Sequence, residues 1–271
     1  MPKEDLSAGF RNVDQTAAPE AFVHYLDAVT ARLQAWKQHS FALLEVHPGV
    51  QLLDVGCGTG DDVQALAHLV GGTGHVMGID SSETLIAEAR KRTQGQQLPV
   101  EYRVGDAQRL DFAENTFDGC RAERVFVHLE HPQQALAEMV RVARPGGRIV
   151  VSDPDFGTLI VDTADRELTR KLENFPADHM ARNGWIGRRL WALFHDANLT
   201  DIAITANAGV VTDYVVAVQV LRLREAAERA QEVGTVSAAE AAQWLGQLEE
   251  AGQTGRFFAS LTHFCVSGRK P

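Results

Sequence analysis

The chain has 271 residues, and its 36 acidic residues outnumber its 26 lysines and arginines, which gives a formal net charge of −10. This excess of negative charge would repel a phosphate backbone, so we expect no nucleic-acid partner. No stretch reaches the roughly 18 apolar residues that cross a bilayer, and we therefore expect no membrane partner.

Three cysteines, Cys57, Cys120 and Cys265, lie far apart and lack the spacing of a zinc site or a disulfide framework. Isolated thiols of this kind are typical of a reducing compartment, and the N-terminus lacks the apolar core of a secretory signal. We expect a cytoplasmic protein without a bound metal, either a monomer or a homodimer.

The first predicted element is a helix over 19–44, where apolar side chains recur every three or four residues. Strands and helices then alternate, and a glycine or proline ends most of them. This alternation predicts a parallel sheet with helices on both faces, which binds its ligand at the carboxyl ends of the strands. The predicted strands are 51–55, 75–79, 100–104, 117–122 and 148–152, and the helices are 61–70, 83–92 and 132–143.

The second half of the chain is less regular. Residues 162–198 have a helical pattern, 202–206 form a predicted strand, and 214–251 give two further helices. A last strand is predicted over 256–266, rich in Phe, Leu and Thr.

A glycine-rich turn follows the first predicted strand. Gly56, Gly58 and Gly60 let the backbone bend sharply and approach a ligand closely, and the next helix presents free N–H groups. Asp80 ends the second strand about twenty residues later, where a carboxylate can accept both ribose hydroxyls. Dinucleotide-binding proteins share this arrangement, so the turn alone does not separate a methyltransferase from a nicotinamide-dependent oxidoreductase.

Two further carboxylates separate these alternatives. Asp54 lies inside the turn motif, where it suits an ammonium group, and Asp106 ends the third strand, where it suits an adenine amino group. Three carboxylates at successive strand ends would repel a pyrophosphate but not a cationic sulfonium. The machinery of hydride transfer is also missing, because no tyrosine has a lysine four residues on.

Four segments together resemble the class I S-adenosylmethionine-dependent methyltransferases, and most closely their small-molecule branch: Leu52–Gly60, Gly78–Ser81, Gly105–Leu110 and Arg144–Gly147. The resemblance covers roughly residues 45–155. It implies a Rossmann-like, mostly parallel sheet of seven strands with helices on both faces, an antiparallel seventh strand at 256–266, and a helical cap. Residues 1–45 would form an N-terminal cap segment, and 46–271 the methyltransferase domain, with helical insertions near 162–198 and 214–252.

The resemblance also implies a cofactor site for S-adenosyl-L-methionine. The glycine turn would meet the methionine part, Asp80 the ribose, and Asp106 the adenine. The full set of expected cofactor-binding residues is Asp54, Gly56, Cys57, Gly58, Asp80, Ser81, Asp106, Ala107, Arg121 and Glu123.

Methyl transfer from a sulfonium is an in-line displacement, which needs alignment and sometimes a base. His128 and Asp155 are the candidate catalytic groups, although His128 also suits simple packing of the next helix. The candidate acceptor pocket is Tyr25, Trp36, Arg124, His128 and Phe156, while His179, Trp185, Phe257 and His263 are interpreted as packing residues.

Three functional hypotheses follow. The first is methyl transfer to an oxygen, nitrogen or carbon of a small-molecule acceptor. The second is a protein that binds S-adenosylmethionine without methylating, as a cyclase or a regulator. The third, the oxidoreductase, is the least supported.

Overall fold

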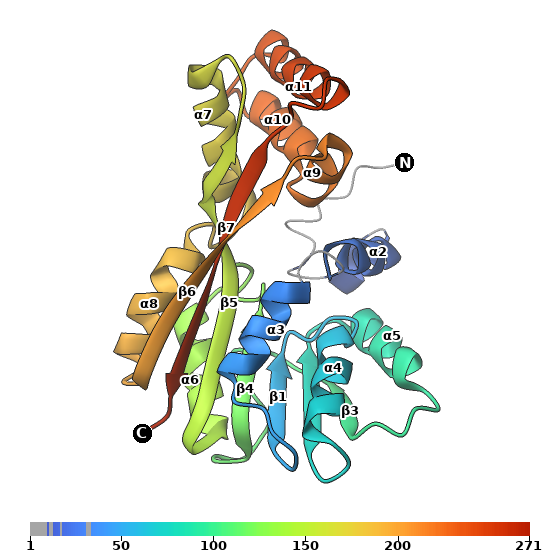
Figure 1. The fold of residues 1–271 in the computed structure, drawn as a ribbon, viewed down its shortest axis with the longest axis vertical. Helices are drawn as coiled ribbons and strands as arrows, with labels where there is room; N and C mark the ends of the chain where they lie inside the picture. Colours follow the sequence, from blue (N-terminus) through green and yellow to red (C-terminus); the bar gives the residue numbers. More distant parts are fainter. Residues whose placement is uncertain (1–9, 11–12, 17, 31–33) are drawn as a thin grey trace.

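The computed structural model describes residues 10, 13–16, 18–30 and 34–271, which form one seven-stranded sheet in the order β3-β2-β1-β4-β5-β7-β6 (Figure 1). Strand β7 runs antiparallel to β5 and β6, whereas the other neighbours pair in parallel. The Rossmann-like fold and its antiparallel last strand are therefore confirmed. The strands are β1 (Gln51–Val55), β2 (His75–Asp80), β3 (Val100–Val104), β4 (Phe117–Glu123), β5 (Ala143–Val161), β6 (Thr200–Val211) and β7 (Ala259–Arg269).

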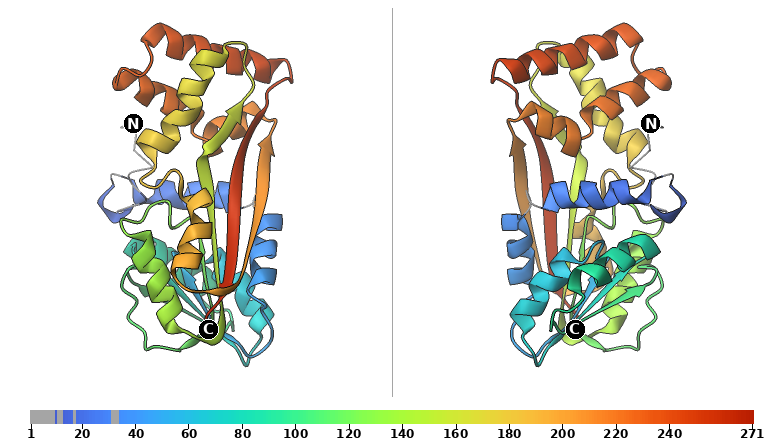
Figure 2. Two further views of the ribbon diagram at one scale, coloured as in Figure 1. Left: turned by 90° about the vertical axis from the view of Figure 1, so that its left-hand side faces the viewer. Right: turned by 90° about the vertical axis from the view of Figure 1, so that its right-hand side faces the viewer.

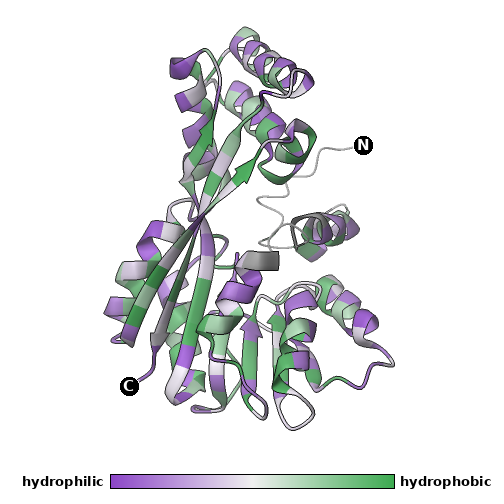
Figure 3. Cartoon of the chain, in the orientation of Figure 1, coloured by the Kyte–Doolittle hydropathy of each residue, from purple (hydrophilic) through white to green (hydrophobic). Residues whose placement is uncertain are grey.

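Helices cover both faces of the sheet, as the alternating pattern predicts. Helices α3, α4 and α5 pack on one face, and α6 and α8 on the other. Successive strand residues point to opposite faces of the sheet. Leu52 therefore packs in the core under α3, α4 and α5, and Leu53 packs in the core under α6 and α8. Apolar residues follow the strands accordingly (Figure 3). These helices are α3 (Gln34–Leu43), α4 (Asp61–Val70), α5 (Glu83–Thr93), α6 (Pro132–Val142) and α8 (Ile186–Asp196).

Three strands continue beyond this sheet and carry a second layer of helices, which we call the upper lobe. Figures 1 and 2 show this lobe at the far ends of the long strands. It has its own core, which contains the almost fully buried Trp244 together with Leu172, Leu223 and Leu261. Besides the far ends of β5, β6 and β7, the upper lobe contains α7 (Arg166–Phe175), the π-helical turn η2 (Pro176–Met180), α9 (Tyr214–Val220), α10 (Leu223–Glu232) and α11 (Ala238–Gln253).

The fifth strand is much longer than predicted. The expected strand 148–152 extends over Ala143–Val161, and Ser152–Phe156 is not the turn that its Asp-Pro-Asp sequence indicates. Pro154 lies opposite His263 of β7 in the ladder. The Asp153 carboxylate accepts hydrogen bonds from the backbone N–H groups of Phe126 and Val127, which compensates its burial.

The predicted helix 19–44 is two helices, α2 (Pro19–Thr30) and α3. Helix α3 packs on the sheet, whereas α2 lies between the sheet and the upper lobe (Figure 2). The turn η1 (Val13–Gln15) precedes α2, and its Asp14 accepts hydrogen bonds from Ser82, Glu83 and Thr84 at the start of α5. This contact fixes the N-terminal segment beside the strand ends.

Candidate functional site

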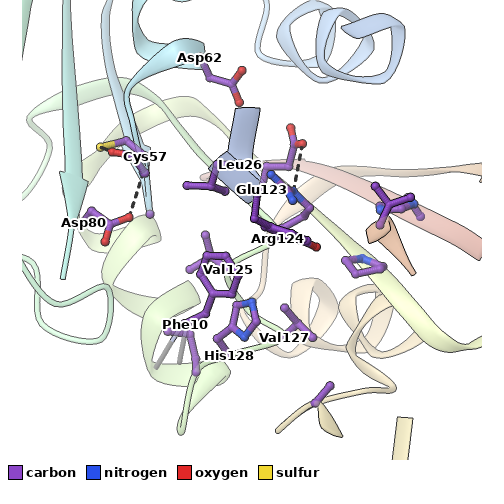
Figure 4. Close-up of a pocket in the computed structure, with 18 of the residues that line it drawn as sticks. Phe10, Leu26, Cys57, Asp62, Asp80, Glu123, Arg124, Val125, Val127 and His128 are labelled. Atoms are coloured by element: carbon purple, nitrogen blue, oxygen red, sulfur yellow. Dashed lines mark hydrogen bonds and ion pairs between the residues drawn. The ribbon is translucent and has the colours of Figure 1, made fainter. Parts of the chain in front are cut away.

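A cavity of about 960 Å³ lies where the carboxyl ends of β1, β2 and β4 face α2 and the upper lobe. This volume is at the upper end of the range for small-molecule sites. One wall consists of the glycine turn and the strand-end carboxylates (Figure 4). The lining residues of the upper lobe are mostly apolar, with Thr212, Asp213 and Arg222 as exceptions, so the cavity has a polar half and a mostly apolar half, which we call the apolar half.

The glycine turn is shaped by contacts that exclude side chains. Gly56 has a φ of 71°, and a Cβ there would lie 2.3 Å from Val125 Cγ2. Gly58 also has a positive φ, and its N–H donates to Asp80 Oδ2 at 2.9 Å. The backbone of the turn is thereby held against the cavity, where a ligand can approach it closely.

Asp80 connects the turn to the next helix. Its second oxygen, Oδ1, accepts a hydrogen bond from the Ser82 N–H at 3.0 Å. Burial raises the pKa of Asp80, although the N–H groups of Ser82 and Gly58 oppose this shift. Each carboxylate oxygen has a second lone pair, so the group can also accept hydrogen bonds from a ligand in the cavity.

Arg121 is the centre of a buried charge network. Its Nε donates to Ser40 at 2.9 Å, and its Nη1 lies 3.0 Å from both Asp54 Oδ1 and Asp62 Oδ2. Its Nη2 donates to Glu123. The side chain is 1% exposed, and all its nitrogens have partners within the protein. Arg121 therefore positions the acids around it, and its guanidinium is already occupied by contacts within the protein.

Asp54 and Glu123 are the acids of this network that suit a cationic ligand group. Burial raises the pKa of Asp54 to about 6, while Arg121 opposes the shift. Glu123 Oε1 is buried without a hydrogen bond among the described residues, and lies 3.9 Å from Lys37 Nζ. Both carboxylates line the cavity, where an ammonium group would gain two negative neighbours.

The remaining expected cofactor residues also line the cavity. Asp106 is exposed at its rim, and its Oδ1 accepts the Gln108 N–H at 2.8 Å. Ala107 and Ser81 lie beside it on the same wall. Cys57 lines the cavity too, but its sulfur lies against Gly78, where a Cβ would be 2.9 Å away. All ten expected cofactor residues are brought together.

A family model described as a methyltransferase domain matches residues 46–202, more than half of the chain. The chain belongs to the class I S-adenosylmethionine-dependent methyltransferases. It is an enzyme that takes its methyl group from S-adenosylmethionine. The oxidoreductase and the non-methylating hypotheses are set aside accordingly.

This methyltransferase has relatives in sequence and in structure. It is 38% identical to an uncharacterized 37.1 kDa protein in transposon TN4556 of Streptomyces fradiae, over 94% of this chain and 72% of that one. It is 37% identical to a demethylmenaquinone methyltransferase of Bacillus cereus over 48% of this chain, and so spans 55% of that relative. A putative methyltransferase from Bacillus halodurans superposes with a TM-score of 0.60 at 18% identity, covering 87% of this chain and 98% of that one.

Four of the five expected acceptor-pocket residues of the methyltransferase line the cavity: Tyr25, Arg124, His128 and Phe156. The His128 ring stacks on Phe10, with 5.2 Å between the ring centroids. The structure places Trp36 elsewhere. Its side chain is buried under the sheet, where Nε1 donates to Ser152 Oγ at 2.9 Å, because α3 packs against β5 instead of covering the cavity.

Asp155 is not available as a catalytic base. It is fully buried, and Arg188 contacts both of its oxygens through the guanidinium and its backbone N–H. The Gly157 N–H donates to it as well, at 3.1 Å. A carboxylate with these partners tethers α8 to β5, and it does not line the cavity. The prediction of a catalytic Asp155 is corrected in this way.

Sequence reasoning missed several residues of the site. Lys37 donates to both oxygens of Asp62 at 2.7 Å from α3, and no motif marks it. His263, interpreted as a packing residue, lines the cavity from β7. The apolar wall comes from the upper lobe and the strand ends beside it, which periodicity shows only as helices and strands. That wall includes Phe156, Met180, Val211, Val216, Val220, Leu221 and Leu261.

No group of three or more His, Cys, Asp and Glu side chains in the described part of the chain is arranged to hold a metal ion. Among the described helices, none is both long and apolar enough to cross a bilayer.

His263 gives the methyltransferase a predicted pH dependence. Burial lowers its pKa to about 4, and the charge of Arg124 acts in the same direction. Between about pH 6.5 and pH 4 the unfolded chain binds a proton at this residue and the native state does not, so stability falls as the pH falls, by at most about 3 kcal/mol.

We expect His263→Gln to remove this contribution. Urea unfolding at about pH 7 and about pH 5 gives the change in the free energy of unfolding between the two pH values. The difference in this change between wild type and variant is the contribution of His263. His47→Gln is the matched control, because His47 is exposed and should leave the slope unchanged. If the free energy of unfolding changed equally between the two pH values in wild type and in His263→Gln, this would contradict the buried, neutral state of the imidazole.

Proposed function

We propose that this enzyme methylates a small molecule, which binds in the apolar half of the cavity while S-adenosylmethionine occupies the polar half. The observation that carries this proposal is the continuity of the cavity from the glycine turn to the upper lobe. A single volume lined by both halves brings a methyl donor and an acceptor into one water-poor space. The relationship to a demethylmenaquinone methyltransferase supports a small-molecule acceptor.

The residues of the polar half fit the cofactor by charge and by shape. We propose that Asp80 accepts the ribose hydroxyls, that Asp54 and Glu123 balance the ammonium group, and that Asp106 with Ala107 bounds the adenine. Gly56 and Gly58 leave room for the methionine part, since neither position carries a side chain. When bound, S-adenosylmethionine supplies the activated methyl group.

The protein's own contribution is alignment and exclusion of water. The Arg121 network holds Asp54 and Glu123 in place, so the cofactor half is ordered before ligands arrive. Leu26 of α2 approaches the turn closely, because a Cβ on Gly58 would be 3.2 Å from its Cδ1. The apolar wall covers the side of the cavity opposite the glycine turn. It keeps water away from the methyl donor, which disfavours hydrolysis of the donor, and it favours an apolar acceptor.

His128 remains a predicted general base. It lines the cavity, but its ring is stacked on Phe10 and engaged with the protein. We propose no obligatory proton transfer through it.

The test combines binding with transfer. Isothermal titration of the purified chain should show S-adenosylhomocysteine binding, and incubation with methyl-labelled S-adenosylmethionine and a metabolite extract should place label on a small molecule. Label appearing only on protein or nucleic acid would contradict the small-molecule acceptor. Boiled protein and a His47→Gln variant serve as the negative and positive controls, since His47 is exposed outside the cavity.

A further inference from the structure

We propose that the acceptor is an otherwise apolar molecule with one acidic hydroxyl, phenolic or enolic, which binds as its oxyanion between Arg124 and His263. This inference rests on the proposed function and specifies the acceptor of the same cavity. It comes from two polar side chains at the border between the polar and the apolar half.

Arg124 differs from the other cations of the cavity in what it contacts. Its Nε is buried and makes no hydrogen bond among the described residues, and its ion pair with Glu123 Oε1 is long, at 3.9 Å. By contrast, Arg121 and Lys37 both have carboxylate partners at 3.0 Å or less. A buried guanidinium N–H without a hydrogen bond is costly, so a ligand that accepts a hydrogen bond from Nε would complete its environment.

The backbone of Arg124 supports a functional interpretation. Its φ is 56°, in the left-handed region that an arginine rarely adopts, and its N–H donates to the Ser152 carbonyl at 2.8 Å. That hydrogen bond holds the strand end in this conformation. Rare backbone conformations held by their surroundings concentrate at ligand-binding sites. Figure 4 shows Arg124 beside Glu123, in the middle of the pocket.

His263 provides a second polar atom at this place. Its Nδ1 is buried and has no hydrogen-bond partner among the described residues. Since burial and the charge of Arg124 lower its pKa to about 4, the imidazole is neutral at physiological pH. A neutral imidazole has one N–H, and in the tautomer that carries this hydrogen on Nδ1 it can donate to an oxyanion in place of the Leu261 backbone; it is a poor acceptor of a proton near neutral pH.

The remaining surface limits the rest of the acceptor. Beyond Arg124 and His263, most lining side chains are apolar, such as Phe156, Met180 and Leu261, although Asp213 and Arg222 also line the cavity. The guanidinium of Arg124 attracts an oxyanion, whereas it repels an ammonium group, which Asp54 and Glu123 would attract to the polar half instead. The cation also lowers the pKa of a bound hydroxyl, so the acceptor loses its proton to solvent on binding and needs no protein base.

The transfer step is then balanced. The electron pair of the oxyanion, on oxygen or on the carbon conjugated with it, forms a bond to the methyl carbon. The bond from that carbon to sulfur breaks, and its electron pair stays on sulfur. The products are S-adenosylhomocysteine and the methylated acceptor, and one positive and one negative charge are neutralised.

A matched pair of aromatic probes tests this assignment. The full chain, saturated with S-adenosylhomocysteine, is titrated with 2-naphthol and with 2-naphthylamine, which share a ring system and differ in the polar group. We expect the naphthol to bind at least about tenfold more tightly, and to show the absorption band of its ionised form below its solution pKa.

The variants identify the cation responsible. Arg124→Met should weaken naphthol binding about tenfold to a hundredfold and remove the ionised band, whereas Arg124→Lys should retain part of both. Arg182→Met is the control, because Arg182 also lines the cavity but pairs with Glu130 at 3.4 Å. It should bind naphthol like wild type. Affinity for S-adenosylhomocysteine, measured on each variant, shows that the cofactor half is intact.

Preference for the amine, equal binding of both probes, absence of binding by either, or an unchanged ionised band in Arg124→Met would each overturn the proposal. These outcomes differ from failure of the proposed function. If wild type does not bind S-adenosylhomocysteine at all, the cofactor half itself is wrongly assigned.

Discussion

Replacing Arg121 with methionine should lower the free energy of unfolding by about 3–5 kcal/mol, because it leaves buried carboxylates without their main cation. Asp54, Asp62 and Glu123 all contact this guanidinium, and Lys37 and the more distant Arg124 would be the cations that remain nearby. Urea denaturation followed by circular dichroism measures the loss. Arg144→Met is the matched control, since Arg144 is 41% exposed in its pair with Asp118 and should cost less than about 1 kcal/mol.

The same variant should show a characteristic pH dependence. Without Arg121, which lowers the pKa values of Asp54 and Asp62, burial raises these values in the native state above those in the unfolded chain. Groups with a raised native pKa stabilise the fold at low pH and lose that contribution as the pH rises. The destabilisation should therefore be smaller at about pH 5 than at about pH 8, and a defect independent of pH would argue against a buried charge network.

Replacing Asp80 with alanine should weaken binding of S-adenosylhomocysteine by at least about a hundredfold. Two charge-assisted hydrogen bonds to the ribose would be lost, each contributing about 1.5–3 kcal/mol, and the Gly58 N–H would lose its acceptor. Isothermal titration calorimetry gives the dissociation constants directly.

Asp111→Ala serves as the control for Asp80→Ala, because Asp111 is exposed and does not line the main cavity. Its affinity should equal that of wild type. Asp80→Asn separates two contributions, since the amide oxygen can still accept the Gly58 N–H while the charge is gone. Unaltered affinity in Asp80→Ala would show that the ribose is held elsewhere.

The sequence was most informative where local chemistry and periodicity agree. The glycine turn and the acids at 54, 80 and 106 mark strand ends, and parallel strands bring their carboxyl ends to one edge whatever else the fold does. The cofactor half could therefore be assembled from a one-dimensional pattern. Arg121 was predicted to bind the cofactor, but its contacts with Asp54, Asp62 and Glu123 make it an internal counter-ion, and two of these acids are distant in sequence.

The acceptor half could not be read in this way. Whether Asp155 faces the cavity or Arg188 depends on the register of β5 against β7 and on the packing of α8. The apolar residues of α2 and α3 follow the same helical spacing. The spacing therefore does not show that Trp36, on α3, packs against the sheet, and only the fold shows which helix covers the cavity. His263 resembles any buried histidine until the unpartnered nitrogen is placed beside Arg124.

The long strands β5, β6 and β7 enter both cores, and this has a consequence for how specificity can evolve. Their hydrogen-bonded ladder is continuous between the two cores, so it fixes the distance between the two halves of the cavity. The position of the upper lobe is therefore set by the strands and needs no hinge. Helices inserted between these strands can be exchanged or lengthened without disturbing the methyl-donor site. In this architecture the methyl-donor site can stay the same while the part of the cavity that binds the acceptor changes.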